Sequence, residues 1–277
     1  MLRRPIETAS DFRTLSFGTP SGHEMMRYEY SNVGSKAVIM KIDKTFDVRT
    51  DTPPNEDPDK HSATLRAYHQ ILWSKNLPNG KPFTLDASIP GEYLFHESEI
   101  GTFSLSSDAI AGTFIFAKRM QHIIDQINEP EREGILVPRF NIGGFIIFPA
   151  RKKNNKMTIN GARGLNARIV DRFDLTLECI RRYYLSIESP LGEVFQRYED
   201  FFKLFGSFEN YVNFFLLQDL VNPKTGSVKF FIPFDDSFPS RPIPKSLEDY
   251  RLYIEKLMEF AQMRGERMEK FGAVSSE

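Results

Sequence analysis

Cysteine and tryptophan are scarce in this sequence, with one of each among 277 residues. Because Cys179 is the single cysteine, one chain can form neither an internal disulfide nor a thiolate-rich zinc site, and a reducing compartment is expected. The N-terminal region lacks the apolar run of a signal peptide, and no segment approaches the ~20 apolar residues of a membrane span. These absences predict a cytoplasmic protein that does not enter a membrane.

A strong net charge is missing as well. The formal charge is -1 at pH 7, from 36 basic and 37 acidic residues. This balance provides no overall field for nucleic acid or an anionic membrane, so such a partner would require a local patch. Phenylalanine, in contrast, is abundant, with 25 residues. Each buried aromatic ring removes roughly 150 to 250 Å² from water, so the chain can form a sizeable core.

The hydrophobic pattern alternates between extended and helical segments. Extended structure is predicted for residues 11–42, 82–105, 143–149 and 228–233. Helices are predicted for residues 63–75, 107–128, 167–184, 191–205, 208–220 and 246–271. The pattern favours one α+β domain over residues 1–277, in which a small mixed or antiparallel sheet packs with about five to six helices and the C-terminal part, 167–271, is mostly helical.

Two segments of opposite charge interrupt this pattern. Residues 43–61 are acidic and contain three prolines, a composition typical of a long loop. Residues 151–166 are basic, contain no acidic residue, and include Gly161 and Gly164 immediately before the helix predicted over 167–184. The two loops are therefore candidates for recognition surfaces.

The basic loop suggests an anion-binding site. Unpaired backbone N–H groups and the positive dipole end at a helix start attract anions, and nearby guanidinium groups strengthen this attraction. Arg163, Asn166 and Arg168 are the predicted ligands. The glycine spacing matches neither a Walker loop nor a dinucleotide-binding fingerprint. The alternative is a solvated basic hairpin in which Asn166 caps the helix.

The same helix carries a charged face opposite its apolar stripe. At about 100° per residue, two arginines and three acids crowd together there: Asp171, Asp174, Glu178, Arg181 and Arg182. If this face of the helix lined a cleft, the acids would hold a divalent cation and the arginines would bind a phosphate. This combination of groups is used in phosphodiester hydrolysis. The alternative is a surface face stabilised by ion pairs between neighbouring turns.

His69 is the histidine with the most suggestive setting, on a helix and four residues before Trp73. A half-buried imidazole there would be a candidate general base, although the sequence shows no carboxylate partner for it. The alternative is a histidine packed at the edge of the core. Ser107 and Asp108 are interpreted as a helix cap, and Cys179 has no neighbours that would activate its thiol.

Several distinctive motifs are spread along the chain: Asp51-Thr-Pro-Pro-Asn-Glu-Asp-Pro-Asp59, Ser104-Leu-Ser-Ser-Asp-Ala-Ile110, Ile159-Asn-Gly-Ala-Arg-Gly164 and Phe214-Phe-Leu-Leu-Gln-Asp-Leu220, with others within 65–80 and 171–184. Together they resemble a family of uncharacterised bacterial cytoplasmic proteins with no assigned activity. It implies a bacterial, cytoplasmic, single-domain protein. It assigns no catalytic residue.

These patterns support two hypotheses of function. In the first, the protein binds a phosphate-bearing ligand, a nucleotide or nucleic acid, and the hydrolytic form of this hypothesis uses Asp171, Asp174, Glu178 and His69, with a divalent cation as a compatible cofactor. In the second, the protein is a non-catalytic interaction protein whose charged segments recognise a protein partner. The sequence specifies neither the metal nor the oligomeric state.

Overall fold

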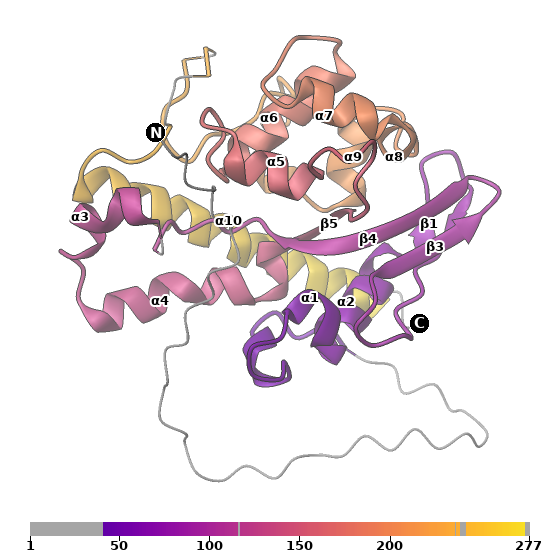
Figure 1. Ribbon diagram of the computed structural model, residues 1–277, viewed down its shortest axis with the longest axis horizontal. Coiled ribbons are helices and arrows are strands. Elements are labelled where there is room, and N and C mark those ends of the chain that lie inside the picture. Colours follow the sequence, from indigo (N-terminus) through magenta and orange to yellow (C-terminus); the bar gives the residue numbers. More distant parts are fainter. Residues whose placement is uncertain (1–40, 116, 236, 239–241, 275–277) are drawn as a thin grey trace, which may run out of the picture. The chain divides into compact units, whose positions relative to one another are not determined.

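The computed structural model describes residues 41–115, 117–235, 237–238 and 242–274. These residues combine helices with two small antiparallel sheets, so the predicted α+β class is confirmed (Figure 1). The prediction of extended structure over residues 11–42 lies almost entirely outside the described residues.

Within these residues the larger sheet has three strands in the order β3-β4-β5, and both neighbouring pairs are antiparallel. The strands are β3 (Leu94–Ser98), β4 (Gly101–Ala109) and β5 (Phe145–Pro149). The smaller sheet pairs β1 (Lys75–Asn76) with β2 (Pro82–Phe83). All five residues of β5 are buried, as expected for a short apolar run that follows two glycines.

The two neighbours of β4 cover different parts of it. β3 pairs with the first half of β4, up to the pair of Leu94 with Leu105. β5 pairs with the second half of β4, from Leu105 to Ala109. Among the described residues, one edge of β4 beyond Leu105 therefore has no strand beside it, and its polar backbone groups need other partners.

Ten α-helices surround the sheets in the described part of the chain. Their bounds are α1 (Pro58–His61), α2 (Ala63–Trp73), α3 (Gln121–Ile124), α4 (Glu129–Phe140), α5 (Ile159–Leu165), α6 (Phe173–Tyr184), α7 (Gly192–Arg197), α8 (Glu199–Lys203), α9 (Phe208–Phe214) and α10 (Leu247–Val274). Short 3-10 turns are η1 (Val48–Thr50), η2 (Lys118–Met120), η3 (Ile142–Gly144) and η4 (Gln218–Leu220). In Figure 1, α5 to α9 lie on the opposite side of β4 from α1 and α2.

The longest helix, α10, begins as its sequence predicts. The Ser246 hydroxyl accepts a hydrogen bond from the Asp249 N–H at 3.1 Å, which caps the first turn. Along its length α10 packs on η3, α4 and α2. The contact with η3 is close because Gly143 lies against the backbone of α10, where a Cβ atom would come within 2.0 Å of the Ala261 carbonyl oxygen.

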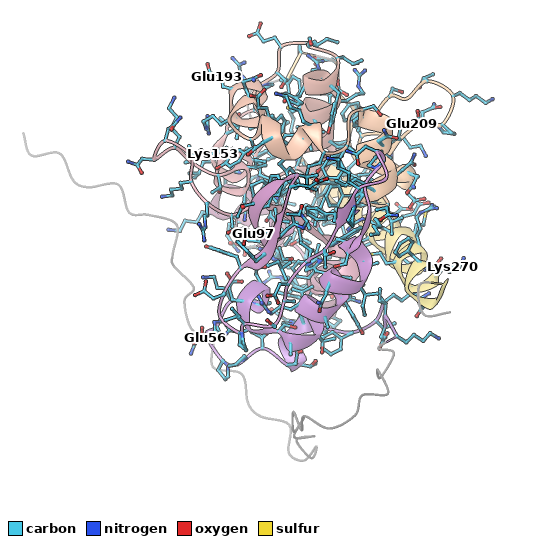
Figure 2. All side chains as sticks on the ribbon, turned by 90° about the vertical axis from the view of Figure 1, so that its right-hand side faces the viewer. Glu56, Glu97, Lys153, Glu193, Glu209 and Lys270 are labelled. Carbon is cyan, nitrogen blue, oxygen red and sulfur yellow. The ribbon has the colours of Figure 1, made fainter. Side chains whose placement is uncertain are left out.

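Aromatic side chains make up much of the core. Rings from α8, α9 and the residues after α9 contact one another at centroid distances of 4.8 to 5.4 Å, and Trp73 of α2 joins them through Phe215 at 5.2 Å. Figure 2 shows the contrast with the outer surface, from which charged side chains such as Glu193, Lys153 and Lys270 project. The abundance of phenylalanine thus predicts the composition of the core correctly.

The helix predicted over residues 107–128 is wrong. Ser107 and Asp108 lie in β4, and regular helix begins again only at α3. Both residues are good helix caps, but pairing with β5 supplies backbone hydrogen bonds to this stretch, as in the Asp108 pair with Ile146. A partner nearly forty residues away in the sequence therefore overrides the local preference.

The helix predicted over residues 167–184 begins later, at Phe173. Val170 and Asp171 adopt positive φ angles of 46° and 67°, which a continuous right-handed helix does not allow. The predicted basic loop also differs, because its second half forms α5, where Thr158 caps the helix through the Gly161 N–H. A helix start at residue 167, on which the anion-site prediction depended, is absent.

The structure differs from the predictions in three smaller ways, which concern residues 43–61, the helices of residues 191–220, and residues 228–233. The acidic segment 43–61 contains η1 and α1, and its carboxylates serve as caps: Asp47 accepts from Arg49, and Asp57 accepts from Asp59. The helices predicted over 191–205 and 208–220 are shorter, because Tyr198 separates α7 from α8 and α9 ends at Phe214. Residues 228–233 form no strand beyond a single bridge of Val228 to Val221.

The close approach of η3 and α10 predicts the effect of a small substitution. Gly143→Ala should lower the free energy of unfolding by roughly 3 kcal/mol, because the added methyl group forces two backbones apart. Gly164→Ala is the control, since Gly164 is exposed in α5 with nothing within 4 Å of its Cβ position, and it should be neutral or stabilising by up to about 1 kcal/mol. Urea unfolding of both variants measures the difference, and equal stabilities would contradict this packing.

Candidate functional site

Arg163 connects the sheet to the helices that follow it. The side chain is fully buried, and its Nη1 atom lies 2.6 Å from Asp108 Oδ2 and 3.1 Å from Asp171 Oδ1. Its Nη2 atom donates to the Asp171 carbonyl oxygen at 3.2 Å. The prediction placed Arg163 and Asp171 at one site, and the structure does bring them together. The arginine is engaged by the protein itself.

The uncovered edge of β4 is satisfied by side chains. Asp59 of α1 accepts a hydrogen bond from the Ser107 N–H at 2.5 Å, and the Ala109 carbonyl oxygen accepts one from Arg163 at 3.3 Å. In an antiparallel strand these alternate residues point their N–H and C=O groups to the same edge. We call Asp59, Asp108, Arg163 and Asp171 the β4-edge cluster.

Two carboxyl groups of the β4-edge cluster have shifted proton affinities. Burial raises the pKa of Asp59 to about 7, and the neighbouring charge of Asp57 acts in the same direction. Burial also raises the pKa of Asp108 to about 6, although the Arg163 guanidinium opposes this shift. Raised carboxyl pKa values are found at catalytic sites and also in structural ion-pair networks.

His69 lies in the core with both ring nitrogens hydrogen-bonded. The Trp73 indole N–H donates to Nδ1 at 2.9 Å, and Nε2 lies 2.9 Å from the Ser107 hydroxyl. Because an indole nitrogen only donates, Nδ1 must be the acceptor and the neutral ring carries its proton on Nε2. Burial, with the charges of Arg264 and Arg66, lowers the pKa of His69 to about 3. This is the arrangement of a histidine packed in the core, with its lone pair occupied.

Asp174 is buried at the start of α6 and pairs with Arg172. The two side chains form a two-pronged ion pair, and Asp174 Oδ2 also accepts from the Phe231 N–H at 3.0 Å. Arg172 donates further to the Pro242 carbonyl oxygen at 3.0 Å. The pair thus fixes the segments around Phe231 and Pro242 against α6, and both Asp174 carboxylate oxygens are engaged within the chain.

Glu178 is buried between two arginines of its own helix. Its carboxylate oxygens lie 2.8 Å from Arg181 Nε and 2.9 Å from Arg182 Nε. Arg182 also stacks on the Phe238 ring, with 4.8 Å from its Cζ atom to the ring centroid. Ion pairs therefore connect the side chains on the charged face of α6, and this face is largely buried. In the described residues no group of three or more His, Cys, Asp or Glu side chains is arranged to hold a metal ion.

The two remaining predicted ligands lie in the turn before α6. The Asn166 side chain accepts from the Arg168 N–H at 2.9 Å and donates to the Pro190 carbonyl oxygen at 3.3 Å. Arg168 is exposed. Cys179 is buried, and burial raises the pKa of its thiol to about 12, so the thiol is not activated, in agreement with its sequence context.

A hollow of about 680 Å³ opens on the surface beside the end of α6. It is lined by Tyr183 of α6, by Gly192, Glu193, Gln196 and Arg197 of α7, and by four loop residues: Lys156, Ser186, Ile187 and Glu188. A second hollow of about 280 Å³ shares Tyr183, Ser186 and Gln196 with the first and adds Lys203 of α8. We call the two together the α6–α8 groove.

The sequence singled out Arg163 and Asp171 of the β4-edge cluster as candidate site residues, but it gave no ligand role to the other residues of the two arrangements. Asp108 was assigned to a helix cap and Asp59 to an acidic loop, because their approach depends on strand β4 and helix α1 packing together. For the α6–α8 groove one signal was available: Lys156 belongs to the basic segment that the sequence marked as a phosphate site. Arg197 and Lys203 lie in the helix predicted over residues 191–205, to which the sequence assigned no ligand.

Comparison with known proteins places the chain in a family. The model of DUF6994, a family of unknown function, matches residues 42–268. Since the match covers well over half of the sequence, the chain belongs to this family. No curated protein and no solved structure matches it. None of the helices among the described residues is both long and apolar enough to cross a membrane.

The raised pKa of Asp59 predicts how stability varies with pH. Between about pH 4 and pH 7 the folded protein keeps a proton on Asp59 that the unfolded chain has released, so the free energy of unfolding should fall as pH rises through this window. Asp59→Asn keeps an acceptor for the Ser107 N–H but cannot ionise, so its stability relative to the parent should rise with pH across this window, by up to about 4 kcal/mol.

Denaturant unfolding at several pH values measures this difference. The exposed Asp125, changed to Asn, serves as the control and should leave the pH profile of the parent unaltered. A constant stability difference between Asp59→Asn and the parent across the window would show that Asp59 is ionised throughout.

Proposed function

We propose that this protein binds a phosphate-bearing ligand in the α6–α8 groove. The observation that carries the proposal is that Lys156 and Arg197 line one hollow, Lys203 lines the adjoining one, and Tyr183 lines both. A volume of about 680 Å³ lies within the range of small-molecule sites, roughly 300 to 1,000 Å³. An aromatic face beside cationic side chains suits a base or other ring that carries phosphate.

The charges of the groove favour a nucleotide over a nucleic-acid strand. Glu188 and Glu193 line the same hollow as Lys156 and would repel a long polyanion. Lys203 is paired with Glu199 at 2.8 Å, which reduces its attraction for a further phosphate. The near-zero net charge supplies no long-range attraction either. A compact ligand with one phosphate group near Lys156 avoids these costs.

The proposed ligands differ from those that the sequence suggested. Arg163, Arg181 and Arg182 are engaged by carboxylates of the chain, and Asn166 braces a turn. Asp171, Asp174 and Glu178 do not line the groove. The proposal is therefore one of binding, and hydrolysis by these acids and His69 stays a prediction. We also keep the expectation of a bacterial, cytoplasmic protein.

A protein partner is the second candidate function. Four large apolar side chains near the groove are unusually exposed: Leu165 by 67%, Leu185 by 53%, Met157 by 47% and Ile187 by 47%. Apolar side chains in the centre of a polar surface are typical of protein interfaces. The same face would then contact another protein through these residues.

Thermal unfolding with added nucleotides tests the first candidate. A nucleoside mono- or diphosphate at a hundred times its dissociation constant should add about 2.7 kcal/mol of stability. Lys156→Ala should weaken binding about tenfold, equal to about 1.4 kcal/mol, because the larger hollow loses an exposed cation. Lys152→Ala is the matched control, since Lys152 is also exposed on the same segment but does not line the groove.

Two results would contradict the proposal. One is the absence of any stabilisation by nucleotides or inorganic phosphate. The other is equal affinity in the Lys156→Ala, Lys203→Ala and Lys152→Ala variants, which would place binding elsewhere and leave the protein-partner candidate for this surface.

A further inference from the structure

Lys75 is enclosed by aromatic rings at the start of β1. Its Nζ atom lies 4.4 Å from the centroid of the Phe214 ring, 4.5 Å from that of Phe271 and 5.1 Å from that of Trp73. We call these three rings the aromatic cage. Nζ also donates a hydrogen bond to the Phe214 carbonyl oxygen at 2.7 Å. Lys75 as a whole residue is half-buried.

The aromatic cage contains no negative charge to balance this amine. Among the described residues, no carboxylate lies within ion-pair distance of Lys75 or of Arg264, the nearest buried cation. Arg264 donates to the next carbonyl oxygen, that of Phe215, at 3.1 Å and lies 6.0 Å from the centroid of the same Trp73 ring. Lys75 and Arg264 thus both lie near the Trp73 ring, and they donate to the carbonyl oxygens of two consecutive residues.

Burial and the Arg264 charge act against the protonated amine. Burial, reinforced by Arg264, lowers the pKa of Lys75 to about 8, and burial lowers that of Arg264 to about 9. The rings act in the opposite direction, because an ammonium over an aromatic face is stabilised by the ring electrons. The net pKa is nevertheless lowered, so the loss of hydration without a counter-ion outweighs this stabilisation.

We propose that Lys75 is a nucleophilic amine that forms an imine with the aldehyde or ketone carbonyl of a small ligand. A desolvated lysine beside another cationic group is an established way to activate an amine. The neutral nitrogen lone pair attacks the carbonyl carbon to give a carbinolamine. This intermediate loses water as the C=N bond forms, so no oxidant or reductant is required.

This proposal does not rest on the α6–α8 groove, and its test is separate. The native protein is treated with acetaldehyde and sodium cyanoborohydride, which reduces any imine to a stable secondary amine, and each lysine is followed by peptide mass spectrometry. The internal reference is Lys203, which is exposed and paired with Glu199 so that its pKa is raised. Lys75→Arg confirms the identity of the modified peptide.

The expected result is preferential modification of Lys75. Near neutral pH it should react on the order of tenfold faster than Lys203, since a lower pKa leaves more of its amine unprotonated. Its rate should level off above about pH 8, while that of Lys203 continues to rise. The preference should disappear in urea, where the aromatic cage is lost. A Lys75 rate equal to or below that of Lys203 in the folded protein would overturn the proposal.

Discussion

A guanidinium group can be buried only where acceptors meet its N–H groups, and several elements of this fold are positioned by that requirement. Arg163 joins β4 to the turn before α6 through Asp108 and Asp171. Arg172 joins α6 to the Pro242 segment. Arg264 of α10 donates to the carbonyl oxygens of Gly143, Phe145 and Phe215. Each arginine ties together parts of the chain that are distant in sequence.

This constraint also determines which charged residues remain for function. Most of the charged residues around α6 form ion pairs inside the molecule. Glu178 is the clearest case, because two arginines share its carboxylate. The cations that face a surface hollow are different ones, Lys156, Arg197 and Lys203. A charged cluster in a sequence therefore marks either a ligand site or a buried network, and here the network predominates.

Prediction from sequence succeeded where the signal is local. The apolar stripe of α6, the cap of α10 at Ser246 and the apolar run of β5 are each contained in a short stretch, and the structure confirms them. It failed at Ser107 and Asp108, where the decisive partner is a strand far along the chain. It failed again at the start of α6, where Asp171 takes up a left-handed conformation while its carbonyl oxygen accepts from Arg163.

The candidate sites follow the same rule. The sequence singled out Arg163 and Asp171 as candidate site residues but did not predict their ion pair, nor the approach of Asp108 and Asp59, which requires the sheet. The aromatic cage could not be predicted from sequence patterns either, since Trp73, Phe214 and Phe271 come from three separate regions of the chain. Sequence spacing reports contacts within one helix or turn, whereas these sites are assembled by packing.

The central claim is that Arg163 is a structural link between the sheet and the helices, and a double-mutant cycle with Asp108 tests it most directly. Arg163→Met and Asp108→Asn should each lower the free energy of unfolding by about 3 to 5 kcal/mol, because each leaves a buried partner without its counterpart. The double variant should lose at least about 1 kcal/mol less than the sum of the two single losses. Additive effects, or an Arg163→Met variant within about 0.5 kcal/mol of the parent, would contradict the claim and return Arg163 to the group of candidate ligand residues.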